Sequence, residues 1–203
     1  MRALRVAGWL LCFLVVLCSD GRAQETPASG TKVILLGTGT PNPDPERAGP
    51  AMAIVVNGSV YLVDCGPGIV RRAAAAGLKM PDLKRVFITH LHSDHTAGFS
   101  DLIFSPWVLE RAAPLEAYGP PGLQNMSEHI LAAYAEDIEM RIKGFEGANP
   151  TGYKVNAHEI QPGTIYEDHI HFAFTPEFDS KGYRLMAARM AEVLGETWQL
   201  KAK

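Results

Sequence analysis

The chain has 203 residues and a formal net charge of −3, and 47% of its residues are hydrophobic and 20% are charged. This composition is typical of a globular protein with one domain and a substantial core. The mildly acidic balance argues against nucleic-acid binding, because proteins bind phosphate backbones through basic surfaces.

The first 23 residues are typical of a secretory signal. Arg2 and Arg5 precede an apolar run over 6–18, and Gly21-Arg22-Ala23 has the small-x-small form of a cleavage site. The apolar run is short for crossing a bilayer. We therefore expect cleavage after residue 23, no membrane span in the mature chain, and a periplasmic or extracellular location. An uncleaved anchor is the alternative. Two of the three cysteines lie in this segment, so the mature chain keeps only Cys65 and has no internal disulfide.

From residue 24 onward, strand and helix patterns alternate, which predicts a mixed α/β fold. The apolar run Lys32–Leu36 predicts a buried strand. Asn57-Gly58 is the strongest short signal for a hairpin between two strands. Further along we expect helices over 69–78 and 123–145, strands within 83–92, 114–122, 153–160 and 169–174, and an amphipathic helix over 182–203.

The segment Thr89–His95 reads THLHSDH and holds three of the chain's seven histidines. Imidazole nitrogens and carboxylate oxygens are ligands for zinc and similar divalent ions. Alternate spacing directs His90 and His92 to the same side of an extended backbone. The following turn brings Asp94 and His95 to a neighbouring point. One short loop can therefore serve two metal ions about 3.5–4 Å apart.

This segment resembles the H-x-H-x-D-H signature of the metallo-β-lactamase superfamily. LLGTGTP, YLVDCGPG and YGPPG resemble, in the same order, the ribonuclease Z and arylsulfatase-like branch, and the resemblance covers about 31–160. It implies an α+β sandwich with four αββα layers and two zinc ions at the sheet edge. It also implies hydrolysis in which a metal-bound hydroxide attacks a phosphoryl, sulfuryl or acyl centre.

Carried over by position, the resemblance implies a role for each residue of the loop. His90 and His92 hold the first ion. Asp94 and His95 hold the second, and Asp94 is also the catalytic residue that orients the water. Asp64 supports the loop from behind through hydrogen bonds. The alternative for Asp64 is an ordinary turn residue at the end of a strand.

The later ligands of the family have no clear counterpart here. Phe178 or a neighbour stands where a third histidine is expected, and the bridging carboxylate and last histidine have no match. We expect the family domain over 24–181 to be incomplete at its C-terminus and to be followed by a divergent helix over 182–203. The spare candidates for the missing ligands are His158, His169, His171, Glu177 and Asp179. Unpaired strand edges make a homodimer plausible.

A second, weaker resemblance concerns the tail. Asp168 and His171 resemble the closing D-x-x-H block of SGNH-type esterases. No Gly-Asp-Ser nucleophile block precedes them, so a Ser-His-Asp triad cannot be completed.

The helix expected over 123–145 carries more acidic than basic residues, which suits a phosphate backbone poorly. The leading hypothesis is therefore a metal-dependent hydrolase acting on a small phosphate or sulfate ester, with nucleic acid unlikely as a partner. The alternatives are a catalytically impaired remnant or non-enzymatic binding protein of the same fold and, less favoured, a tRNA 3′-processing endonuclease. Trp107 follows the histidine loop and is a candidate pocket wall, with core packing as the alternative.

Overall fold

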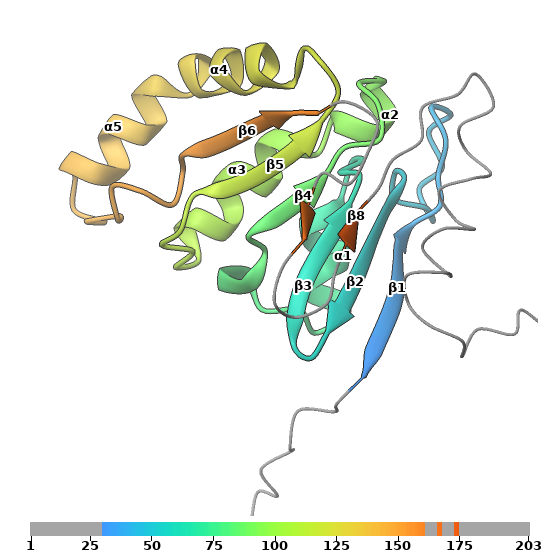
Figure 1. Cartoon of the computed structure of the whole chain (residues 1–203). Helices are drawn as coiled ribbons and strands as arrows, with labels where there is room; N and C mark the ends of the chain where they lie inside the picture. Colours follow the sequence, from blue (N-terminus) through green and yellow to red (C-terminus); the bar gives the residue numbers. More distant parts are fainter. Residues whose placement is uncertain (1–29, 161–165, 168–172, 175–203) are drawn as a thin grey trace, which may run out of the picture.

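The computed structural model describes residues 30–160, 166–167 and 173–174. Six strands form one sheet in the order β1-β2-β3-β4-β5-β6 (Figure 1). The first three pair antiparallel, and β3 to β6 pair parallel. The strands span Thr31–Gly37 (β1), Ala51–Val56 (β2), Ser59–Val63 (β3), Arg85–Phe87 (β4), Leu115–Gly119 (β5) and Val155–Glu159 (β6).

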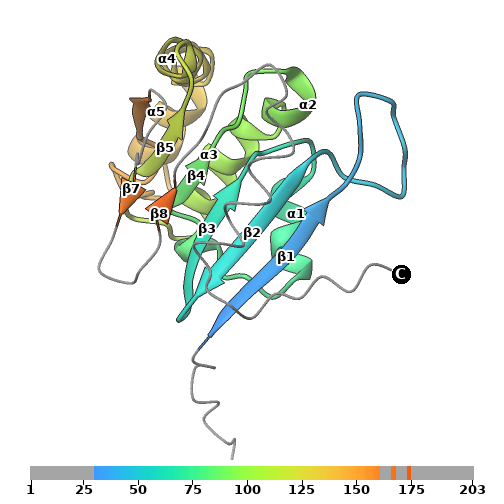
Figure 2. The same cartoon turned by 45° about the vertical axis from the view of Figure 1, so that its right-hand side comes forward.

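Helices follow the strands of the parallel half. They span Ile69–Ala75 (α1), Ser93–Thr96 (α2), Phe99–Val108 (α3), Leu123–Ala133 (α4) and Ala135–Lys143 (α5), with a short 3₁₀ turn at Met80–Asp82 (η1). α1 and α3 lie on the same side of the sheet (Figure 2). The expected mixed α/β class is confirmed.

The hairpin expected at Asn57-Gly58 is confirmed. Val56 pairs with Ser59, so these two residues form the whole connection. Asn57 has φ 47° and Gly58 φ 85°. Both lie in the left-handed region that a tight two-residue hairpin turn requires and that Asn and Gly adopt most readily.

Both faces of the sheet bury apolar side chains. On the helix side, Ala53 and Leu62 join the core made by α1 and α3. Alternate residues of the same strands bury a second cluster on the opposite face, formed by Ile54, Val56, Tyr61, Val63 and Phe87. A sheet buried on both faces is what a four-layer sandwich needs in its middle. The described residues supply one helix layer and this sheet, together with a two-stranded sheet of β7 (Tyr166–Glu167) and β8 (Ala173–Phe174).

The single helix expected over 123–145 is wrong, because the chain bends at Tyr134 into α4 and α5. Tyr134 has φ −101° and ψ 16°, outside regular helical geometry. Its ring packs against Phe104 of α3, with centroids 4.4 Å apart. The contact of this ring with α3 therefore occurs at the bend. The apolar residues keep a helical period across Tyr134, so the sequence did not predict a bend there.

Arg111 is buried, and its hydrogen bonds connect separate parts of the fold. It is 0% exposed, and its guanidinium donates to the carbonyls of Leu83, Leu102, Ile103 and Gly152 at 2.7–3.0 Å. Pro106 lies inside α3 and has no N–H, so the Leu102 carbonyl lacks its usual helical donor. Arg111 takes that place. Burial lowers the pKa of Arg111 to about 10, so the group stays charged at neutral pH.

The proposed signal over 1–23, the proposed helix over 182–203 and most of the strand at 169–174 lie outside the described residues. Within the described part of the chain, no helix has the length and apolar character needed to cross a bilayer.

Candidate metal centre

The histidine loop leaves the carboxyl end of β4, and the one-turn helix α2 closes it (Figure 1). The loop lies at the edge where parallel strands β3 to β6 end, which is where open α/β sheets place their ligands. Thr89 to His95 all fall within this turn, so the sequence alone brings the four predicted ligands together.

His90 and His92 form the first donor pair. Their rings meet edge to face with centroids 4.6 Å apart, and His90 Nε2 lies 3.1 Å from His92 Nδ1. Two nitrogens on one tetrahedral zinc are about 3.3 Å apart, given bonds of about 2.0–2.1 Å. The separation therefore suits two ligands of one ion.

Asp94 and His95 form the second pair. His95 Nε2 lies 3.6 Å from Asp94 Oδ2. The His90 and His95 rings are 4.2 Å apart between centroids, so the two pairs are adjacent. Both side chains of the second pair are only 14% exposed, which limits competition from bulk water.

Asp64 lies beneath both pairs. Its Oδ1 accepts a hydrogen bond from the Thr89 N–H at 2.8 Å, and its Oδ2 lies 2.8 Å from His95 Nδ1. The Thr89 hydroxyl donates to the same carboxylate at 2.9–3.0 Å and lies 2.9 Å from His90 Nδ1. Partners at both Nδ1 atoms favour protons there and leave both Nε2 atoms as lone-pair donors.

Thr89 was missed by the sequence reasoning. Its position could have indicated a role, because a residue with a hydroxyl group lies directly before the first histidine at the end of a buried strand. Asp64 itself has φ 58°, a left-handed conformation that Asp tolerates better than most residues. This conformation turns the chain at the end of β3 and directs the carboxylate under the loop.

The pKa values of His90 and His95 are shifted in opposite directions. Hydrogen bonding to Asp64 raises the pKa of His95 above its usual 6.5. Burial, reinforced by the neighbouring His95, lowers the pKa of His90. The carboxylate thus favours a proton on one ring while the surroundings keep the other neutral, as a metal ligand must be.

Glycines allow the backbones around the loop to touch. A Cβ on Gly66 would lie 2.5 Å from the Asp94 carbonyl, and one on Gly98 would lie 2.4 Å from the Gly66 carbonyl. Cys65 N–H donates to the His95 carbonyl at 2.9 Å. These contacts tie the loop to the turn after β3 and fix its position.

Cys65 is a structural thiol within this contact region. It is 0% exposed, and burial, followed by the nearby Asp64 charge, raises its pKa well above the usual value. In a full chain carrying Cys12→Ser and Cys18→Ser, we expect Cys65 to react with a disulfide reagent at pH 8 roughly a hundredfold more slowly than in urea, because the thiolate is the nucleophile. Equal rates would show that this turn opens readily.

Comparisons with known proteins found similar sequences and similar structures. The family described as Anti-Pycsar protein Apyc1 matches residues 31–172. Ribonuclease Z of Mycobacterium marinum is 42% identical over 139 residues, covering 67% of this chain and 50% of the relative. Human tRNase Z, short form, superposes with a TM-score of 0.50 at 29% identity, over 63% of this chain and 43% of that one.

The chain belongs to the Anti-Pycsar protein Apyc1 family and to the metallo-β-lactamase superfamily. YhfI from Bacillus subtilis shares the fold, with a TM-score of 0.50 at 19% identity over 68% of this chain and 48% of that one. The chain spans about half the length of the curated relatives it matches. The relatives named here are hydrolases, ribonuclease Z and tRNase Z.

Metallo-β-lactamase proteins are usually zinc-dependent, so the donor set can be tested for fit. Each pair offers two donors with suitable chemistry and spacing, whereas a catalytic zinc usually has three protein ligands. Within the residues that the structure describes, no cluster of three or more His, Cys, Asp or Glu side chains could hold one ion. The four loop residues therefore fit half of each coordination shell.

The spare ligand candidates do not complete these shells within the described chain. His158 lies on β6, where it contacts Glu116 at 2.7 Å and stacks on Tyr118. The other spares, His169, His171, Glu177 and Asp179, lie outside the described residues, as does Asp168 of the esterase-like block.

Trp107 does not wall a pocket. It is 1% exposed in the core, its Nε1 donates to the Asn149 carbonyl at 2.8 Å, and its ring packs near Tyr153. The core alternative is correct because the indole is buried against the segment that holds Asn149 and Tyr153, and its one polar atom is satisfied there.

Proposed function

We propose that this protein is a metal-dependent hydrolase that cleaves a small phosphate or sulfate ester. The observation that carries the proposal is the pair of adjacent donor sets, His90 with His92 and Asp94 with His95, above a single buried carboxylate. Two divalent ions, when bound, supply hydroxide near neutral pH and offset negative charge on the attacked group.

The chain's own residues have separate tasks in this proposal. His90 and His92 bind one zinc ion, and Asp94 and His95 bind the other. Asp94 also accepts a hydrogen bond from the attacking water and so orients it, a carboxylate's usual role beside a reacting proton. Asp64 and Thr89 hold the imidazoles in the required tautomers.

The charge of α5 supports a small ester over RNA. Both basic residues of this helix are already paired: Arg141 contacts Asp137 and Glu146, and Lys143 contacts Glu139. A surface whose cations are neutralised by carboxylates gains little from a phosphate backbone. Processing of tRNA 3′ ends is the second candidate, favoured by the names ribonuclease Z and tRNase Z of the relatives.

A non-enzymatic binding protein of the same fold is a third candidate. It is favoured by the two-ligand limit of each pair within the described residues, since two protein ligands bind zinc more weakly than three.

Export and homodimer formation also belong to the proposal. Export rests on the sequence of residues 1–23, and a dimer is favoured by the edge position of β1, where Leu35 is 70% exposed.

Zinc content is the first test. After dialysis, elemental analysis of the wild-type chain should give about two zinc ions per chain. His92→Ala should lose at least one of them, because it removes half of the first pair. His129→Ala is the matched control, since His129 is exposed on α4. Zinc-loaded protein is then assayed on phosphate esters, sulfate esters and precursor tRNA.

The outcomes separate the candidates. Turnover of small esters that fails in His92→Ala supports the main proposal, and turnover of precursor tRNA alone supports the second candidate. Little zinc in the wild type, with no loss in His92→Ala, would leave a binding protein of this fold.

A further inference from the structure

The strand β1 forms an open edge of the sheet among the described residues. It pairs with β2 alone, and the side chain of Leu35 is 70% exposed. Proteins usually protect an edge strand with charges, prolines or bulges along its length. Lys32 is the single charged residue of this strand, and the bulge falls at its end, between Leu35 and Gly37. The middle of the edge is therefore suited to pairing with another strand.

The pairing with β2 decides which backbone groups of β1 face outward. The Asn57 N–H donates to the Gly30 carbonyl at 3.2 Å, so these two residues form a hydrogen-bonded pair. Hydrogen-bonded and non-hydrogen-bonded pairs alternate along an antiparallel ladder. Thr31, Val33 and Leu35 therefore direct their N–H and C=O groups away from β2. These groups present donors and acceptors along the open edge.

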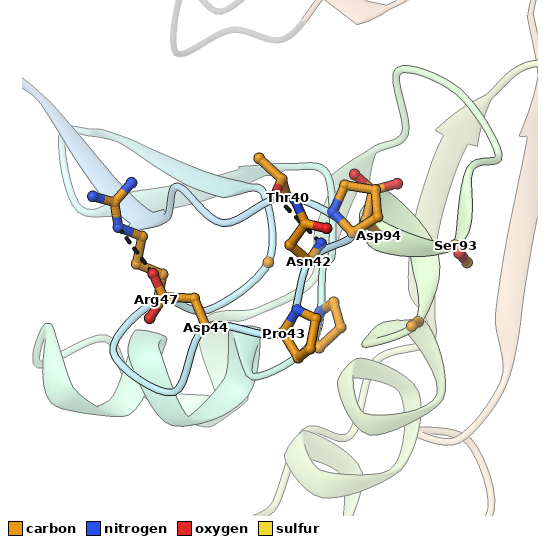
Figure 3. A pocket seen from close by; sticks show the side chains of 11 residues that line it. Thr40, Asn42, Pro43, Asp44, Arg47, Ser93 and Asp94 are labelled. Atoms are coloured by element: carbon orange, nitrogen blue, oxygen red, sulfur yellow. Dashed lines mark hydrogen bonds and ion pairs between the residues drawn. The ribbon is translucent and has the colours of Figure 1, made fainter.

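A cavity of about 340 Å³ lies where this edge ends. It is enclosed by the last residues of β1, the loop that follows them and the end of α1. The cavity beside Asp94 is a different one, which the same loop forms with α2 (Figure 3). Leu36, Ala75 and Ala76 give the cavity at β1 part of its wall. Its volume is within the range of about 300–1,000 Å³ for ligand sites, so it has room for a small apolar side chain and a carboxylate.

Two guanidinium groups line this cavity, those of Arg47 and Arg72, against the single carboxylate of Glu46. Arg72 Nη2 donates to the Glu46 carbonyl at 3.1 Å, which leaves other N–H groups of its five for a ligand. Arg47 Nε lies 3.5 Å from Asp44 Oδ2 (Figure 3). Both side chains of this pair are exposed, at 62% and 44%, and exposed pairs contribute little. The excess of cations favours an anionic group in the cavity.

We propose that β1 and this cavity bind the C-terminal segment of a partner polypeptide. The segment adds a strand along Thr31–Leu35 and runs parallel to β1, because the cavity lies at the end toward which β1 runs. Its last side chain, a small apolar one, packs on Leu36 and Ala75. Its terminal carboxylate contacts Arg47 and Arg72. Strand addition to a sheet edge and capture of a C-terminal carboxylate are both general modes of peptide recognition. The inference goes beyond the proposed hydrolase function and does not depend on it.

A second copy of β1 fits this cavity less well than a C-terminal segment. A two-fold pairing of two β1 strands is antiparallel, and centring it on Val33 places Lys32 of the second copy opposite Ile34. This arrangement moves a cation toward the two arginines and brings no carboxylate to them. The homodimer proposed above competes for the same edge, so the test includes the mass of the protein in solution.

The test measures binding of a fluorescent hexapeptide to the full chain by anisotropy. The peptide alternates threonine with valine and ends in valine with a free carboxylate, and the same peptide with a C-terminal amide is the control ligand. We expect the carboxylate form to bind roughly tenfold more tightly, the order of one charge-assisted hydrogen bond.

Variants assign the binding to the cavity. Arg47→Gln should remove most of the preference for the carboxylate form, and Ala75→Leu should weaken both peptides roughly tenfold by filling the cavity. Arg71→Gln and Ala74→Leu are the matched controls, since both residues are exposed on α1 and neither lines the cavity. Both controls should keep the wild-type affinities and the preference.

Val33→Pro tests the added strand. Proline removes an N–H that faces away from β2, so the ladder between β1 and β2 is kept, as edge strands allow. Both peptides should bind this variant at least roughly tenfold more weakly, with the circular dichroism of the fold unchanged. No binding of either peptide, equal binding of the acid and the amide, or a preference that survives Arg47→Gln and Arg72→Gln would overturn the inference. A dimer that becomes a monomer in Val33→Pro, without peptide binding to the wild type, would assign the edge to a second copy instead.

Discussion

Replacing Arg111 with methionine should lower the free energy of unfolding by about 3–5 kcal/mol, because four buried carbonyls lose hydrogen bonds to a charged donor, a type of bond worth about 1.5–3 kcal/mol each. Methionine keeps much of the side-chain volume but removes the donors for four carbonyls, which come from the end of the 3₁₀ turn η1, from α3 and from the segment after α5. Each buried acceptor left without a donor costs about 1–3 kcal/mol. Partial entry of water limits the total.

Urea denaturation followed by circular dichroism measures this effect. Arg71→Met is the matched control, since Arg71 is exposed on α1, and it should change stability by less than about 0.5 kcal/mol. Arg111→Lys should fall between the two, because an ammonium group has fewer donors and no planar fork. A midpoint for Arg111→Met equal to that of Arg71→Met would show that the carbonyls find other donors.

Local sequence signals predicted much of the sheet. Asn57-Gly58 defines its hairpin through backbone conformation alone. The apolar run at Lys32–Leu36 lies within β1 as expected, but its expected burial is wrong: β1 is an edge strand in which Lys32 and Leu35 are exposed and only Leu36 is buried. The buried position of Arg111 was not predictable, because an arginine next to a glutamate normally indicates a surface. Its burial depends on a carbonyl freed by Pro106 and on Gly152, which come together only in the folded chain.

The candidate site was predictable where its residues are close in sequence. His90 to His95 belong to one turn, so their spacing alone places them together. Support from Asp64 was inferred only through family resemblance, since 25 residues separate it from Thr89. The proline-rich loop after β1 and the helix α2 line one cavity beside Asp94, and no pattern in either segment predicts that the two meet.

Asp64→Asn should lower the zinc affinity of the chain by about 10- to 100-fold, the usual cost of losing an outer hydrogen-bond partner of metal ligands. Asparagine tolerates the left-handed φ of 58° at this position, so the backbone turn is kept. Its amide can donate toward His95 Nδ1, which would move the imidazole proton to Nε2 and remove that lone pair from the site. Competition against a zinc chelator measures the change, and an affinity equal to wild type would contradict the role of Asp64.

Two variants of Thr89 distinguish the loss of hydrogen bonds to the metal ligands from general damage to the fold. Thr89→Val removes the hydroxyl that links Asp64 to His90 Nδ1, whereas Thr89→Ser keeps it. We expect the valine variant to bind zinc more weakly and the serine variant to resemble wild type. Nitrogen NMR of the metal-free protein should show the His90 tautomer shifting only in the valine variant. Equal spectra for both variants would limit Thr89 to packing.

The same carboxylate predicts a pH dependence in the metal-free chain. Because Asp64 raises the pKa of His95 in the folded state, protonated His95 stabilises the fold fully below its usual pKa of 6.5. That contribution is lost as the pH rises through the higher folded pKa. Wild type should therefore exceed Asp64→Asn in stability most clearly at pH 5–6, with a smaller difference at pH 8–9. A difference that grows with pH would mean that Asp64 stabilises the neutral imidazole instead, and denaturation in urea across this pH range distinguishes the two cases.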